Sequence, residues 1–123
     1  MVFDPQIFLE IADDIVGDRK YHMEGWLRTA IGRAYYAAFL IVEKKLLETG
    51  CRFEDTDKIH QYVIQKAMER NSYLANRLDT VRGYRVKADY ITEERITVDL
   101  ARCSTRLSRE IVNMVHEKKL EPC

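Results

Sequence analysis

The sequence has no proline away from its two ends. Its two prolines are Pro5 and Pro122, and the chain of 123 residues contains only five glycines. Because proline and glycine are the residues that most often interrupt helices, we expect long uninterrupted helices between these positions. No segment shows the alternation of apolar and polar residues that is typical of strands. The sequence therefore predicts an all-α fold, an antiparallel up-and-down bundle of four to five helices, formed by a single domain over residues 1–123.

Net charge and long apolar runs are also missing. Lysine and arginine number 20, aspartate and glutamate number 20, and the formal net charge is zero. No overall basic field therefore attracts nucleic acid or an acidic membrane. No apolar run approaches the roughly 18 residues of a membrane span, and the N-terminus lacks the basic start and apolar core of a signal peptide. We expect no membrane association and a cytoplasmic location.

Cysteine and histidine are few and scattered. Cys51, Cys103 and Cys123 are odd in number and far apart, so we expect reduced thiols and no disulfide framework. The three histidines form neither an HExxH nor an ExxH pattern, and one weak DxxH spacing joins Asp57 to His60. Hydrogen-bonded or surface histidines explain this pattern better than metal ligands do. We expect no metal and no cofactor.

Capping residues and glycines predict where the helices begin and end. A cap at Asp4 with Pro5 in the first turn begins the first helix, and Gly17 ends it. Its apolar face is predicted to consist of Ile7, Phe8, Ile11 and Ile15. The later boundaries are predicted as follows: a long helix over Glu24–Thr49 ended by Gly50, a third helix capped by Thr56 or Asp57, a fourth beginning at Asn71 or Ser72 and loosened at Gly83, and a last one beginning near Thr92.

The most apolar part of the chain lies inside the long helix. No residue from Ala34 to Val42 is charged, so side chains around the whole helix axis favour burial and the helix should be covered on more than one side. The covering elements are either the other helices of a bundle or a second copy of the protein. Four large side chains are the candidates for the core or for a dimer interface: Tyr35, Tyr36, Phe39 and Leu40.

Local charge differs from the overall balance. Between Lys66 and Lys87 there are six basic residues and two acidic ones. Arg82, Arg85 and Lys87 lie close to Tyr90, and arginine suits phosphate while tyrosine can stack on a base. The alternative is a solvated helix end, in which Arg85 pairs with Asp89 four residues later.

Three segments resemble the HEPN domain family. They are RTAIGRAYYAAFLIVEKKL, KIHQYVIQKAM and RLDTVRGYRVKADY, and they span most of Arg28 to Tyr90 in the order found in that family. The combination of RAYYAAF with ADY resembles a branch of small stand-alone archaeal and bacterial proteins. The resemblance implies a helical bundle, usually a homodimer, with a cleft near the dimer axis. Many HEPN proteins are metal-independent RNases, in which an Arg-x4-6-His motif lines the cleft. Others bind nucleotides and form a toxin-antitoxin-like pair with a small nucleotidyltransferase.

The chain departs from the RNase motif at its histidine. Five residues after Arg85 stands Tyr90, and a tyrosine, with an ordinary pKa of about 10, is a poor general base near neutral pH. The resemblance carries over Arg85 and Tyr90 as the motif positions. It implies a nucleotide- or RNA-binding set consisting of Arg82, Arg85, Lys87, Asp89 and Tyr90. His60, on another helix, is the alternative source of a base.

Whether the protein is an enzyme therefore stays open. The leading hypothesis is a dimeric module that binds nucleotide or RNA and pairs with a nucleotidyltransferase. The alternatives are a metal-independent RNase with a degenerate motif, or an assembly protein without a ligand.

Overall fold

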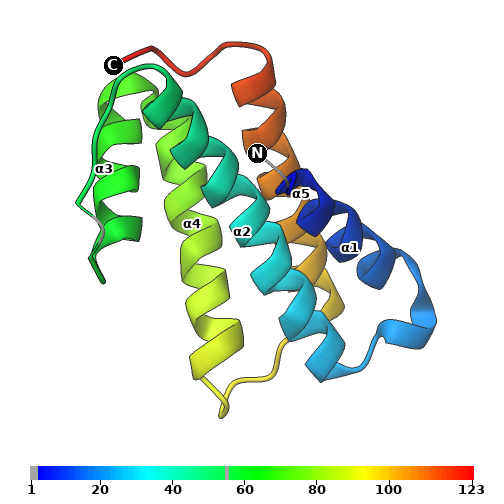
Figure 1. The fold of residues 1–123 in the computed structure, drawn as a ribbon. Coiled ribbons are helices and arrows are strands. Elements are labelled where there is room, and N and C mark those ends of the chain that lie inside the picture. Colours follow the sequence, from blue (N-terminus) through cyan, green and yellow to red (C-terminus); the bar gives the residue numbers. More distant parts are fainter. Residues whose placement is uncertain (1–2, 55) are drawn as a thin grey trace.

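The protein folds as a bundle of helices around one central helix. The computed structural model describes residues 3–54 and 56–123. Its elements are α1 (Gln6–Gly17), the short 3-10 helix η1 (Arg19–Tyr21), α2 (Glu24–Glu48), α3 (Ile59–Arg70), α4 (Ser72–Tyr90) and α5 (Val98–His116). Figure 1 shows that α1, α2, α4 and α5 alternate in direction, whereas the segment after α2 runs back along the bundle, so that α3 points the same way as α2. The predicted all-α class is confirmed.

Helix α2 lies at the centre of the bundle. It contacts α1, α3, α4 and α5, which explains why its sequence is apolar around the whole axis. Between Ala34 and Val42 only Tyr36 and Leu40 keep partial exposure, and the other side chains are buried. The prediction that this stretch is covered from several sides is therefore confirmed within one chain. The described part of the chain contains no helix that is both long and apolar enough to cross a membrane.

Most predicted helix ends match the structure. The Asp4 carboxylate accepts the N–H of Gln6 at 3.0 Å, and Asn71 caps α4 by accepting the N–H of Leu74 at 3.1 Å. Gly50 follows α2 with φ of 113°, a left-handed conformation that glycine adopts at little cost. These ends depend on contacts between residues close in sequence, so a local pattern suffices to predict them.

One predicted boundary is wrong, because α5 begins at Val98 and not near Thr92. Helix α4 continues through Gly83, the residue predicted to loosen its end, as far as Tyr90. The hydroxyl of Thr97 caps α5 by accepting the N–H of Leu100 at 3.2 Å. Glu93 and Glu94, whose negative charges suit the first turn of a helix, belong instead to the loop between α4 and α5.

The predicted apolar faces of the first and last helices are also partly wrong. In α1, Leu9, Ala12 and Ile15 are buried, whereas Ile7 and Ile11 are each 41% exposed. In α5 the buried face is mostly small and partly polar, and consists of Ala101, Ser104, Thr105, Ser108, Ile111, Val112 and Val115. Small side chains allow α5 to approach the alanine-rich α2 closely. The spacing of large apolar residues predicts a face made of Ile96, Leu100, Cys103, Leu107, Ile111 and Met114. Ile96 and Ile111 are buried as predicted, whereas the other four are only half-buried beside the small residues.

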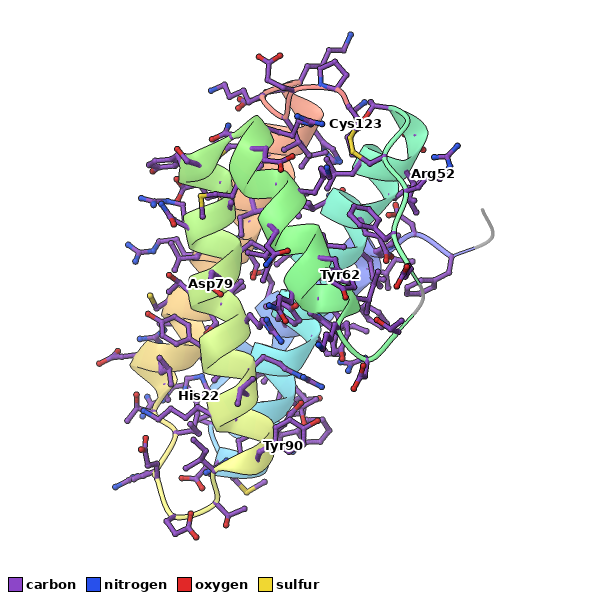
Figure 2. All side chains as sticks on the ribbon, turned by 90° about the vertical axis from the view of Figure 1, so that its left-hand side faces the viewer. His22, Arg52, Tyr62, Asp79, Tyr90 and Cys123 are labelled. Atoms are coloured by element: carbon purple, nitrogen blue, oxygen red, sulfur yellow. A yellow bond between two sulfur atoms is a disulfide. The ribbon has the colours of Figure 1, made fainter. Side chains whose placement is uncertain are left out.

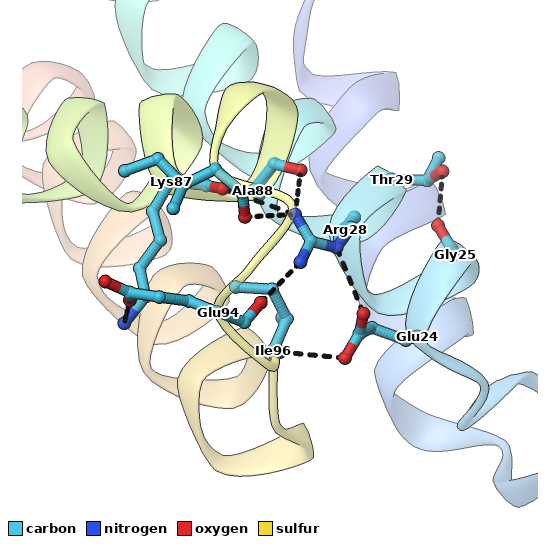
Figure 3. Close-up of polar contacts among 9 residues, drawn as sticks. Glu24, Gly25, Arg28, Thr29, Lys87, Ala88, Glu94 and Ile96 are labelled. Atoms are coloured by element: carbon cyan, nitrogen blue, oxygen red, sulfur yellow. Dashed lines mark hydrogen bonds and ion pairs between the residues drawn. The ribbon is translucent and has the colours of Figure 1, made fainter.

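Arg28 of α2 holds the loop between α4 and α5 in place. Its Nη1 donates to the carbonyl oxygen of Ala88 at 2.8 Å and lies 3.2 Å from that of Ile91, while Nη2 donates to the carbonyl of Glu94 at 2.6 Å. Glu24 pairs with Arg28 and accepts the N–H of Ile96 at 3.0 Å (Figure 3). These contacts satisfy the carbonyl groups that a helix end leaves unpaired, and they fix the direction in which α4 ends.

The prediction that the cysteines form no disulfide is wrong. Cys51 and Cys123 are bonded, with their Cα atoms 5.3 Å apart, a separation that suits a disulfide; Figure 2 shows this sulfur bond beside the C-terminal segment. Cys103 is free and half-buried. Cys51 and Cys123 lie 72 positions apart, so sequence spacing alone contained no signal of their proximity. Because disulfides are rare in cytosolic proteins, the cysteines give no support to the expected cytoplasmic location.

Breaking this disulfide should destabilise the protein. Because it closes a long loop, Cys123→Ser should lower the free energy of unfolding by roughly 2–4 kcal/mol, chiefly by freeing the unfolded chain. Urea denaturation without reductant measures the change, and Cys103→Ser is the matched control because it leaves the bond intact. Equal stability of Cys123→Ser and Cys103→Ser would contradict the expectation.

Candidate functional site

The C-terminal half of α4 directs two arginines toward α2 and α3. Arg82 and Arg85 are three residues apart and so lie on one face of the helix, and both are partly buried. Arg85 Nε lies 2.8 Å from Asp89 Oδ2, and the Arg85 side chain is 17% exposed. Asp89 also faces Gly32 of α2, since a Cβ built on that glycine would lie 3.8 Å from Asp89 Oδ1. A methyl group on Gly32 would therefore meet this carboxylate only in ordinary van der Waals contact.

Two tyrosines flank the Arg85 guanidinium. Its carbon lies 5.2 Å from the centre of the Tyr36 ring and 5.3 Å from that of Tyr90, which are cation–π distances. Arg85 Nη2 also donates to the Tyr90 hydroxyl at 3.4 Å. Tyr90 is 66% exposed and lies at the end of α4 (Figure 2). The exposed ring of Tyr90 thus lies directly beside the positive charge of Arg85.

His60, near the start of α3, is held by aromatic residues of α2. The Tyr35 hydroxyl lies 2.5 Å from His60 Nδ1. The imidazole stacks on Phe39 with ring centres 4.2 Å apart and meets the edge of Tyr36 at 5.8 Å. Since Tyr36 also contacts Arg85, the chain of contacts from α3 to α4 is continuous.

The arginines act electrostatically on this aromatic group. Burial, and then the positive charges of Arg82 and Arg85, hold the pKa of His60 below its ordinary value. Burial also raises the pKa of Tyr35, and the same two arginines partly oppose that rise. A histidine of α3, a tyrosine of α2 and two arginines of α4 therefore share one electrostatic environment.

The structure brings together most of the residues that the sequence singled out. Arg82, Arg85, Asp89 and Tyr90 lie on one side of α4. Lys87 points to another side of α4 than Arg85, because residues two positions apart in a helix differ by about 200° in direction. Its ammonium pairs with Glu94 at 2.8 Å (Figure 3). Its part in binding stays a prediction.

The four large side chains of α2 divide into two pairs. Tyr35 and Phe39 are buried within the chain, at 0% and 3% exposure, and contact His60. Tyr36 and Leu40 are half-buried. Of these four side chains, only Tyr36 and Leu40 are therefore available for contact with a second copy of the protein.

His60 lies closer to the core than the sequence prediction placed it. Val63, Ile64 and Ala67 follow it at three, four and seven residues, a helical spacing that indicates one shared inward face, and all three are buried. In the described residues no group of three or more histidine, cysteine or acidic side chains could hold a metal ion.

The comparisons with known proteins agree with this architecture. The family model described as "HEPN domain" matches residues 8–119, which is most of the chain and includes α2, α3, α4 and α5. No curated protein and no solved structure matches the chain.

His60 should make the protein less stable in acid. Because its pKa is lower in the folded chain than in the unfolded one, the unfolded chain takes up the proton first. The contribution of neutral His60 to the free energy of unfolding is therefore complete above the pKa of about 6.5 that a histidine has in the unfolded chain. It is lost as the pH falls through the lower pKa of His60 in the folded chain. The free energy of unfolding, measured in urea between about pH 7 and pH 5, should fall more for the wild type than for His60→Gln.

His116→Gln is the control for this measurement, since it removes an exposed imidazole at the end of α5. A parallel fall in the wild type and in His60→Gln would contradict the assignment.

Proposed function

The chain belongs to the HEPN domain family, and we propose that it binds the phosphate groups of a nucleotide or of RNA at the surface formed by Arg82 and Arg85 of α4. The observation that supports this most strongly is the position of Arg85 between Tyr36 and Tyr90. A phosphate on the guanidinium edge would bring the attached base within reach of an aromatic ring.

The two arginines have different roles in this proposal. Arg85 already pairs with Asp89, which orients its guanidinium and leaves part of its donor capacity for a ligand. In the described part of the chain no ion pair is found for Arg82. An unpaired arginine beside a neutral histidine is a favourable environment for an anion.

The proposed module is a homodimer, with α2 facing its counterpart. Tyr36, Leu40 and Leu47 follow one side of α2, and Leu47 is 39% exposed. Phe3 is 42% exposed and lines a surface hollow together with Leu40 and Leu47. Burying these side chains against a second copy would remove apolar surface from water. Since Tyr36 also contacts Arg85, each phosphate site would then lie beside the subunit boundary. A small nucleotidyltransferase is the protein partner proposed from the family resemblance, and the cytoplasm is the proposed location.

Removing the two arginines should weaken binding strongly. Fluorescently labelled RNA or ATP is titrated at low salt into the wild type and into Arg82→Ala/Arg85→Ala. Loss of two charged hydrogen-bond donors should weaken binding more than about tenfold. Lys87→Ala should change it less, because Glu94 already pairs with that ammonium. Absence of binding by the wild type, or equal binding by the double variant, would refute the proposal.

The dimer is tested separately by light scattering after size exclusion. The wild type should give twice the 14.5 kDa mass of one chain. Leu40→Glu should give a monomer with unchanged helical circular dichroism, because a charge at this half-buried position would be desolvated in the interface. Thr29→Glu is the control, at an exposed position of the same helix. A monomeric wild type would contradict the assembly.

A further inference from the structure

The bond between Tyr35 and His60 determines which ring nitrogen carries the imidazole proton. Tyr35 is fully buried, and over the described ranges its hydroxyl has one hydrogen-bond partner, His60 Nδ1. If Nδ1 carried the proton and donated it, the buried Tyr35 O–H would lack an acceptor, which is costly. Tyr35 therefore donates to Nδ1. The neutral ring then carries its proton on Nε2.

Nε2 is the nitrogen left to meet a ligand. It has no hydrogen-bond partner in the part of the chain that the structure describes, and His60 is only partly buried. Stacking on Phe39 and the edge contact with Tyr36 restrict the orientation of the ring. His60 thus presents one N–H, held from its far side by Tyr35, in the electrostatic environment of Arg82 and Arg85.

We propose that His60 Nε2–H joins Arg82 and Arg85 in holding a terminal phosphate, so that the site selects a phosphate monoester over an internal phosphodiester. This inference rests on the proposed phosphate-binding function and adds the class of ligand. A monoester has three terminal oxygens and close to two negative charges at neutral pH. A diester has two such oxygens and one charge. Three donor groups, two of them cations, match the monoester better.

The same arrangement bears on the RNase alternative. A general base must offer a lone pair to the proton that it abstracts. With the proton on Nε2 and Nδ1 occupied by Tyr35, the resting imidazole offers none. His60 therefore acts as a hydrogen-bond donor in this site, and Tyr35 is its positioning residue.

The test compares three adenine ligands by isothermal titration calorimetry. AMP is a free nucleotide with a terminal phosphate, pApA is a short RNA with a 5′-terminal phosphate, and ApA has only the internal diester. We expect the wild type to bind AMP and pApA more than about tenfold tighter than ApA, the factor associated with one hydrogen bond to a charged group. Tighter binding of pApA than of AMP would identify an RNA end as the source of the phosphate, and the reverse order would identify a free nucleotide.

Two variants assign the preference to His60. His60→Phe keeps a ring to stack on Phe39 but removes both nitrogens, so its preference for AMP and pApA over ApA should shrink markedly. His60→Gln restores a donor and should recover part of the preference. Circular dichroism and thermal unfolding confirm that each variant is folded.

A spectroscopic measurement separates this role from a merely structural one. Nitrogen-15 NMR of the histidine-labelled protein should show His60 protonated on Nε2, and Tyr35→Phe should give a mixture of both tautomers with weaker AMP binding. Equal wild-type affinity for ApA and pApA, retention of the preference in His60→Phe, or a proton on Nδ1 would overturn the inference. Failure of the wild type to bind any of the three ligands would refute the proposed function itself, and the inference with it.

Discussion

Burial of the stretch from Ala34 to Val42 is the constraint on which the rest of the structure depends. Each large apolar side chain that leaves water there contributes roughly 1.5–3 kcal/mol, and the buried ones contact helices on several sides of α2. This burial turns Tyr35 and Phe39 inward against His60 and leaves Tyr36 beside Arg85. The candidate site therefore lies at the edge of the hydrophobic core, where aromatic residues of α2 contact the charged side chain of Arg85.

A second constraint acts at the end of α4. The guanidinium of Arg28 donates to carbonyl groups of Ala88 and Glu94, which would otherwise lack partners near the bundle surface. These bonds join α2 to the final turn of α4, where Asp89 and Tyr90 lie beside Arg85. The polar contacts of Arg28 thus hold the aromatic and charged groups of the candidate site in a fixed relation to the core.

The parts of the fold that depend on neighbours in sequence could be predicted, and those that depend on distant residues could not. Asn71 caps α4 through an N–H only three residues away, and Arg82 and Arg85 share a face because of helical spacing alone. Glu94, in contrast, suits the first turn of a helix by charge, but Arg28 and Lys87 hold it in a loop. Ser104 and Ser108 are buried although their side chains are polar, since close packing of α5 favours small size over apolar character.

The sequence by itself determined the helical class, the coverage of the stretch from Ala34 to Val42 on more than one side, the family resemblance and the absence of a histidine five residues after Arg85. These follow from composition, from periodicity within single helices and from motif order. Only the tertiary structure decided that Tyr35 anchors His60, that α5 packs through its small residues, and that Cys51 meets Cys123. Each of these pairs residues on different elements, and the free energy that brings them together comes from packing between helices, which no pattern within one helix contains.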